Sequence, residues 1–363
     1  MSDTTALFET AHMGALELKN RVFMAPLTRN RAHADGTPKE MAAEYYAQRA
    51  SAGLIITEAT QISEMGKGYL DTPGIHSEKQ VEAWKKITDA VHDKDGRIFC
   101  QLWHVGRISH TSLLPDGRSP VSSSAKKANA QTFTKNGFED CSQPEALDKN
   151  GIRQTIEDYA HAARMAKKAG FDGVELHGAN GYLVDQFLQD GVNDREDEYG
   201  GSVDNRTRFL REALNAVLDT WGADRVGLRL SPLGQANDVS ESVPESLFGE
   251  AYDHVVKKDL AYLHVVETFP GNQPTDLETT MLKELRMKYS GFFIANGGYD
   301  AASGAEAVSS GHAAAIAYGR PFLANPDLPR RYELGAELNE PNPDTFYGGD
   351  EKGYTDYPFL DGK

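Results

Sequence analysis

Three residues in this sequence have types and a spacing that could carry out acid–base chemistry. His177, Asn180 and Tyr182 lie within one short segment. A neutral histidine and an asparagine can both donate hydrogen bonds to one oxygen atom, and a tyrosine can deliver a proton nearby. The alternative is a polar turn whose side chains cap the following helix, and these three residues alone favour that alternative.

A second group consists of glycines and an arginine. Gly297 and Gly298 follow one apolar run, and Gly319 and Arg320 follow the next one along the chain. Bare backbone N–H groups together with a guanidinium form a typical phosphate site. Two tight turns with a surface arginine would be the structural alternative, but the spacing favours phosphate binding.

Both groups lie at the ends of short apolar runs that alternate with helical patterns. Continuous apolar runs of this length suit parallel strands that are buried on both faces. The eight runs are Val22–Pro26, Leu54–Thr57, Ile98–Trp103, Gly173–His177, Val226–Leu230, Tyr262–Val266, Phe292–Ala295 and Ala314–Tyr318. Their alternation with helices predicts an α/β protein, a (β/α)8 TIM barrel with its active site at the carboxyl ends of the strands. A doubly wound sheet is less favoured because no G-x-G-x-x-G follows the first run.

Two further segments complete the predicted barrel. Met13–Lys19 alternates around Gly14 and predicts an N-terminal hairpin that plugs the bottom of the barrel. The stretch from His104 to about Asn150 is rich in Ser, Pro, Gly and Asn, and it predicts an excursion between the third and fourth strands, β3–β4 in barrel order. We therefore expect a single domain over residues 1–363.

Two helix starts are marked by capping boxes, in which two side chains satisfy free backbone N–H groups of the first turn. Thr37 and Glu40 predict one helix that ends near Gly53. Ser77 and Gln80 predict the start of another helix.

Composition excludes several classes of protein. The 363 residues include 54 acids and 38 bases, and a formal net charge of −16 makes nucleic acid and anionic membranes poor partners. No apolar stretch is long enough to span a membrane, and no secretory signal is visible, so a cytoplasmic protein is expected. Cys100 and Cys141 cannot supply four ligands to an iron–sulfur cluster. No metal-binding motif occurs, so no metal site is expected.

Five motifs, in order along the chain, closely resemble those of the Old Yellow Enzyme flavoproteins, and most closely the bacterial N-ethylmaleimide reductase-type alkene reductases. The resemblance covers about Leu7 to about Asp356. The motifs are Ala25–Arg29, Gln101–Arg107, Val174–Leu183, Asn193–Arg206 and Thr345–Gly349. Five such motifs in the same order are not expected by chance.

The resemblance implies a tightly held, non-covalent FMN. It implies that Thr28 hydrogen-bonds the flavin carbonyl nearest the reactive nitrogen and that Gln101 reaches the pyrimidine edge. Arg229 would lie near N1 and C2, where negative charge accumulates on reduction. The other implied cofactor-binding residues are Ala25, Pro26, Ala59, Gly297, Gly298, Gly319 and Arg320.

The implied reaction is the reduction of the activated C=C bond of enones and enals, with NADPH or NADH as hydride donor in a ping-pong sequence. His177 and Asn180 would hold the carbonyl oxygen of the substrate, and Tyr182 would protonate the α-carbon. Trp103, Tyr69 and Tyr347 would shape the substrate pocket, with plain packing as their alternative role.

Two alternative functions remain at this point. A nitrate-ester or nitroaromatic reductase belongs to the same class, since members of the family often catalyse both reactions. A non-redox barrel, such as a phosphate-binding aldolase or isomerase, belongs to a different class. It would need a Schiff-base lysine or a carboxylate base at a strand end. No lysine lies there, and the one carboxylate, Glu58, has no identifiable partner in the sequence. The sequence predicts neither the physiological substrate nor the oligomeric state.

Overall fold

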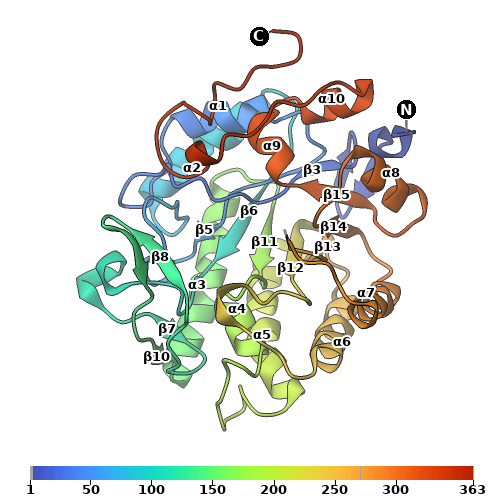
Figure 1. Ribbon diagram of the computed structural model, residues 1–363. Coiled ribbons are helices and arrows are strands. Elements are labelled where there is room, and N and C mark those ends of the chain that lie inside the picture. Colours follow the sequence, from blue (N-terminus) through green and yellow to red (C-terminus); the bar gives the residue numbers. More distant parts are fainter. Residues whose placement is uncertain (1–2, 270, 363) are drawn as a thin grey trace.

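The computed structural model describes residues 3–269 and 271–362, and at its centre is a parallel β-barrel surrounded by helices (Figure 1). Every pair of neighbouring barrel strands is parallel, and the last strand pairs with the first, so the sheet closes on itself. The predicted (β/α)8 fold is confirmed. The eight strand positions are β3 (Val22–Met24), β4 (Ile55–Ile56), β6 (Ile98–Trp103), β11 (Gly173–His177), β12 (Val226–Leu230), β13 (Tyr262–Val266), β14 (Phe293–Asn296) and β15 (Ala315–Tyr318).

Two barrel strands, β3 and β4, are each two residues shorter than the apolar runs predict. β3 ends at Met24, because Pro26 has no N–H to donate to a neighbouring strand. The second run forms only β4, and pairing with β6 resumes at β5 (Thr60–Gln61). Glu58 and Ala59 therefore lie in an interruption between two short strands, where the N–H of Glu58 donates to the Tyr46 hydroxyl and its carbonyl accepts from Oγ1 of Thr60.

An N-terminal hairpin fills the lower end of the barrel, as predicted. β1 (Ala11–Met13) and β2 (Leu16–Leu18) pair antiparallel around Gly14, whose φ is +51°. A Cβ at Gly14 would lie 2.0 Å from the carbonyl oxygen of Asp224, so only glycine fits this turn. The apolar cluster that joins the hairpin to the barrel interior includes Met13, Leu16, Leu18, Phe23, Phe99 and Tyr262.

Helices cover the outside of the barrel. They are α1 (Met41–Gln48), α2 (Glu78–His92), α3 (Lys149–Lys168), α4 (Leu183–Leu188), α5 (Val203–Trp221), α6 (Pro244–Val255), α7 (Asp276–Lys288), α8 (Ala301–Ser309), α9 (Arg320–Ala324) and α10 (Leu328–Leu334). Among the described residues, none of these helices is long and apolar enough to cross a membrane.

One predicted capping box is present and the other is wrong. α2 begins with the reciprocal hydrogen bonds of Ser77 and Gln80. The box predicted at Thr37 does not form, and α1 begins later and ends earlier than expected. The reason is a turn: the carbonyl of Thr37 accepts from the N–H of His33, and its own N–H donates to Asp35. Thr37 is therefore held outside the helix.

The predicted excursion between the third and fourth barrel strands is also present. It contains β7 (Val121–Ser122), β8 (Gln131–Thr134), β9 (Gly137–Asp140) and β10 (Glu145–Ala146), and β8 and β9 form a hairpin at the side of the barrel (Figure 1). Ala128 and Cys141 of the excursion pack in one cluster with Trp103 at the end of β6. The excursion thus covers one side of the barrel mouth.

A buried arginine fastens the C-terminal segment to the loop after β3. Arg29 donates to the carbonyls of Phe346, at 3.0 Å, and Gly353, at 2.7 Å. Its guanidinium lies 5.1 Å from the ring centres of both Tyr45 and Tyr354, which stack on each other 4.0 Å apart. Two of the five motifs, far apart in the sequence, are therefore joined directly.

The close packing of β11 predicts that Gly173 tolerates no side chain. A Cβ there would lie 2.3 Å from the Phe99 ring and 2.4 Å from the carbonyl oxygen of Arg225. We expect Gly173→Ala to lower the free energy of unfolding, measured in urea, by about 1–3 kcal/mol, the usual cost of overpacking. Gly249→Ala is the matched control, because its Cβ would meet nothing closer than 3.7 Å inside α6. Unchanged stability in Gly173→Ala would contradict this packing.

Candidate active site

A cavity of about 610 Å³ lies at the carboxyl ends of the barrel strands. The loops after β11, β13, β14 and β15, Arg229 of β12 and the C-terminal segment all contribute to its wall. Seven residues singled out in the sequence line it: Asn180, Arg229, Gly297, Gly298, Gly319, Arg320 and Tyr347. The strand ends thus converge on one site, as expected for this fold.

The glycines and the arginine on one side of the cavity form a suitable cradle for a phosphate. Gly297 has a φ of +128°, and a Cβ there would lie 2.6 Å from the carbonyl oxygen of Thr268. Gly298 has a φ of +72° and leaves its peptide groups bare. Arg320 is exposed and makes no ion pair with any described residue. A guanidinium beside bare peptide groups matches the charge and geometry of a phosphate.

Arg229 is a buried cation in the cavity wall. Its Nη2 donates to Oδ1 of Asn296 at 3.0 Å, and Asn296 is itself held by a 2.7 Å hydrogen bond to the carbonyl of Ala317. The Nε of Arg229 has no partner among the described residues. An arginine stays protonated at neutral pH, so this fixed positive charge favours an anionic group in the cavity.

A buried polar layer lies beneath Arg229, and sequence reasoning missed two of its members. Glu175 accepts from Nε2 of Gln101 at 2.6 Å and from Nδ1 of His264 at 2.8 Å. With one N–H of Nε2 used in this way, Gln101 keeps its Oε1 and the second N–H of Nε2 for a further partner. The sequence did contain a signal for both residues: Glu175 and His264 are each a charged or polar residue in the middle of an apolar run.

His177 is neutral, and its proton can be assigned to one ring nitrogen. Burial, together with the nearby Arg229 and His264, lowers the pKa of His177 well below its usual range. Its Nδ1 accepts from the N–H of Ala179 at 3.3 Å, so the proton lies on Nε2. His177 is therefore a hydrogen-bond donor through Nε2 at neutral pH.

Asn180 is held in a left-handed conformation, with a φ of +60°, by contacts to its backbone. Its N–H donates to Oγ of Ser231 at 2.9 Å, and its carbonyl accepts from Nδ2 of Asn237 at 2.8 Å. The side-chain Oδ1 is buried and has no partner among the described residues. An unpartnered amide at a cavity wall suggests a role in binding a ligand.

The peptide groups on both sides of Gly181 are held by two buried residues that sequence reasoning also missed. Oδ2 of Asp185 accepts from the N–H of Gly181 at 2.8 Å, and Nε2 of Gln186 donates to the Gly181 carbonyl at 2.8 Å. Gly181 separates Asn180 from Tyr182. Asp185 and Gln186 therefore fix the positions of both neighbours.

Aromatic side chains form a cluster around Tyr182. The hydroxyls of Tyr182 and Tyr69 are 3.1 Å apart, and the Tyr182 ring packs edge-on against Trp103 and His177, at 5.0 and 5.2 Å. Burial raises the pKa of Tyr182, so its hydroxyl keeps its proton. Tyr347 is 63% exposed and lies at the rim of the cavity instead.

The loop after β3 carries residues that the family resemblance implies in cofactor binding, and this loop is close to Gly319. Ala25 is buried, and Pro26 and Thr28 are half-buried. A Cβ at Gly319 would lie 3.4 Å from Leu27 and 4.0 Å from Ala25, so this loop and the end of β15 are adjacent.

Ala59 and Glu58 lie in the interruption of the second strand. Ala59 is buried beside Trp103. Glu58 has partners that the sequence did not reveal: it accepts from the N–H of Arg29 at 3.2 Å and from the hydroxyl of Tyr46 at 3.3 Å. Burial raises the pKa of Glu58 to about 7. Glu58 therefore anchors the loop that carries Thr28.

These features fit a flavin mononucleotide. The bare glycines with Arg320 match its phosphate, and the buried Arg229 with the free Oε1 of Gln101 matches the polar edge of a flavin ring. A cavity of this size is within the ordinary range for cofactor sites.

Comparisons with known proteins agree with this fit. Residues 6–339 match the model of the NADH:flavin oxidoreductase / NADH oxidase family. The chain belongs to this family, of the Old Yellow Enzyme type. It is 48% identical to 12-oxophytodienoate reductase 1 of Oryza sativa subsp. japonica over 356 residues, which cover 96% of this chain and 92% of the relative.

Solved structures of family members superpose over nearly the whole chain. Morphinone reductase has a TM-score of 0.94 at 47% identity, with 98% of this chain and 96% of that chain covered. Its structure in complex with tetrahydroNAD has a TM-score of 0.92 at 46% identity, with 98% and 97% covered. The Old Yellow Enzyme homologue from Zymomonas mobilis has a TM-score of 0.93 at 44% identity, with 98% and 99% covered.

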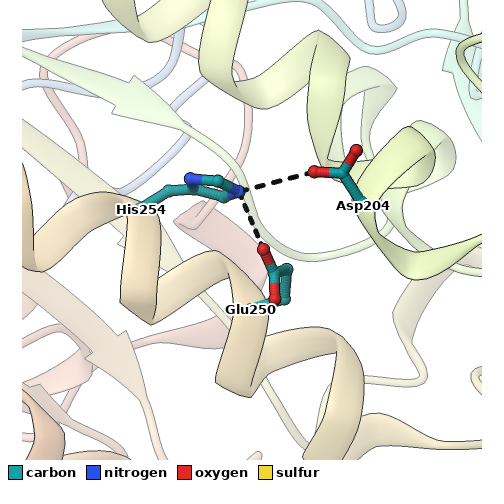
Figure 2. A group of neighbouring side chains, drawn as sticks. All are labelled: Asp204, Glu250 and His254. Carbon is teal, nitrogen blue, oxygen red and sulfur yellow. Dashed lines mark ion pairs between the residues drawn. The ribbon is translucent and has the colours of Figure 1, made fainter.

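One cluster away from the flavoprotein site holds side chains that could bind a metal (Figure 2). Asp204 of α5 and Glu250 and His254 of α6 bring their ligand atoms within 4.8 Å of one another. However, Nη1 of Arg211 lies 3.1 Å from Asp204 Oδ1 and 3.3 Å from His254 Nε2. A guanidinium already supplies the positive charge of this cluster, which joins α5 to α6.

Asp185 should make the stability of the protein depend on pH. Burial, reinforced by the charge of Glu241, raises the pKa of Asp185 to about 7, although Gln189 and the N–H of Gly181 donate to it. An aspartate in an unfolded chain titrates near pH 4, about three units lower. Between these two values the folded state binds more protons than the unfolded state, so stability falls as the pH rises.

We expect Asp185→Asn to reduce this fall by up to about 1.4 kcal/mol per pH unit, because asparagine still accepts from Gly181 but cannot ionise. Urea unfolding between about pH 4 and 7 measures the slope. Asp219→Asn, which removes an exposed carboxylate from α5, controls for the loss of one charge. An identical slope in the parent and in Asp185→Asn would rule out this role for Asp185.

Proposed function

We propose that this protein is an FMN-dependent NAD(P)H oxidoreductase that reduces the activated C=C bond of α,β-unsaturated carbonyl compounds. The observation that carries the proposal is the loop after β11. It presents a neutral His177 in register with Arg229 of the cavity wall, and an Asn180 side chain without a partner among the described residues. Two neutral donors on one loop suit an oxygen atom on which negative charge develops.

The cofactor is proposed to bind across the mouth of the barrel. When bound, FMN supplies a redox centre that accepts a hydride from a nicotinamide and passes it to an alkene. The relative bound to tetrahydroNAD supports a nicotinamide as donor, NADPH or NADH. The residues proposed to hold FMN are Ala25, Pro26, Thr28, Ala59, Gln101, Arg229, Gly297, Gly298, Gly319 and Arg320.

His177 and Asn180 hold the carbonyl oxygen of the substrate through Nε2–H and the side-chain amide. As hydride adds to the β-carbon, negative charge moves onto this oxygen, and donors already in place stabilise it more strongly than they stabilise the bound substrate. Tyr182, which keeps its proton, then protonates the α-carbon. Trp103, Tyr69 and Tyr347 shape the pocket around the substrate.

A non-redox aldolase or isomerase is disfavoured by the chemistry of the cavity wall. Its described residues include neither a lysine nor a carboxylate. Glu58 is committed to the Arg29 N–H and the Tyr46 hydroxyl. A cytoplasmic location and a single FMN-binding domain over residues 1–363 stay predictions.

Stopped-flow spectroscopy of the flavin absorbance tests the proposal. The parent protein is first reduced with NADPH or NADH under nitrogen and then mixed with an enone, an enal, a nitrate ester or a nitroaromatic compound. Reoxidation by the enone and the enal is expected. Reoxidation by the nitro compounds alone would favour the xenobiotic reductase instead, and a protein that binds no FMN would contradict both.

The same experiment with Tyr182→Phe tests the proton donor. Reduction by the nicotinamide should be unchanged, because it needs no proton from this hydroxyl, whereas enone turnover should fall by about 10²–10⁴-fold. Tyr159→Phe is the matched control, because this buried hydroxyl on α3 has no partner among the described residues. Equal enone turnover in the parent and Tyr182→Phe would remove Tyr182 from this role.

A further inference from the structure

A carboxylate is buried in the barrel interior, one layer below the cavity. Glu175 of β11 is in register with Gly227 of β12, and His177, two residues further on, is in register with Arg229. Glu175 therefore lies one layer deeper than the arginine in the cavity wall. Burying a carboxylate costs several kcal/mol unless charge and hydrogen bonds compensate it, so its presence here calls for an explanation.

The hydrogen bonds to Glu175 come from two neutral groups. Gln101 of β6 donates from Nε2 at 2.6 Å. Burial lowers the pKa of His264, so its imidazole is neutral and donates from Nδ1 at 2.8 Å. Although burial alone would raise the pKa of Glu175, the electrostatic attraction and hydrogen bond of His264, followed by the charge of Arg229 and the hydrogen bond of Gln101, hold that pKa below its ordinary value. Glu175 is therefore an anion whose permanent countercharge is Arg229.

Arg229 thus has an anion on one side and the cavity on the other. Its Nη2 donates to Asn296, and its Nε has no partner among the described residues. The negative charge of Glu175 therefore reduces the positive potential that Arg229 produces in the cavity. A flavin carries more negative charge after reduction, so the offset matters more for its reduced form than for its oxidised form.

We propose that Glu175 is a positioning residue that lowers the reduction potential of the bound flavin, by offsetting the charge of Arg229 and by fixing the amide of Gln101. This inference rests on the proposed FMN site. A lower potential makes the reduced cofactor a stronger hydride donor to an alkene. It also explains why the barrel retains a buried ion where an apolar side chain would pack at less cost.

The test is the midpoint potential of the bound FMN in Glu175→Gln, measured by equilibration with a reference dye. Glutamine keeps the shape of the side chain and removes its charge. The affinity for reduced FMN, relative to that for oxidised FMN, should rise at least about tenfold, which is about 30 mV for a two-electron couple. Glu175→Asp keeps the charge and should keep the potential close to that of the parent.

Glu241→Gln is the matched control. Glu241 forms a buried ion pair with Arg206, with side chains 4% and 3% exposed, outside the cavity wall. The midpoint potential of FMN bound to Glu241→Gln should equal that of the parent. A shift that occurs only in Glu175→Gln then assigns the effect to Glu175. Equal potentials in the parent and in Glu175→Gln would overturn the inference.

A second measurement covers the case in which Glu175→Gln does not fold, since it leaves Arg229 without its countercharge. The double variant Glu175→Gln/Arg229→Gln removes both charges and should regain folded protein, read from circular dichroism of the apoprotein. Failure of the double variant to recover would count against the charge pair.

The two proposals fail in different ways. A parent protein that binds FMN and reduces enones, with a potential that Glu175→Gln does not change, would refute only the role of Glu175. A parent protein that binds no FMN would refute the proposed function, and the inference with it.

Discussion

The pairing of β15 with β3 is the constraint on which the rest of the site depends. Ile316, Ala317 and Tyr318 pair with Val22, Phe23 and Met24, and this register closes the barrel. Closure places the loop that contains Thr28 against Gly319. It also positions the C-terminal segment, because Arg29 of the same loop donates to the carbonyl of Phe346. Chain segments about three hundred residues apart therefore meet at one mouth, where no local interaction would bring them together.

The barrel interior divides into an apolar lower part and a polar upper part. Below, the N-terminal hairpin fills the space with side chains such as Met13 and Leu18. Above, Glu175, Arg229 and neighbouring side chains replace this packing with charges and hydrogen bonds. Several of their atoms, including Nε of Arg229 and Nε2 of His264, have no partner among the described residues. Such departures from ordinary core chemistry are expected where a protein acts on a ligand rather than where it only folds.

The barrel could be predicted because its strands are short apolar runs, and each run is recognised from neighbouring residues in the sequence. The proposed phosphate cradle could be predicted for a similar reason, since a glycine pair and a Gly-Arg pair each directly follow a strand. The roles of Glu175 and His264 could not be predicted, because each depends on partners in other strands: His264 is 89 positions from Glu175. Likewise, Asp185 looks like an ordinary helical residue until the fold places it against Gly181. The capping box at Thr37 was wrong because a turn with His33 and Asp35 competes for the same groups.

A crystal structure of the protein with FMN would show whether the strand ends form one site for one flavin. We expect the flavin ring beside Arg229 and the amide of Gln101, with its phosphate on Gly298 and Arg320. His177 and Asn180 should then face the open side of the ring. A flavin bound elsewhere, or a phosphate away from the two glycine turns, would show that the strand ends do not form this site.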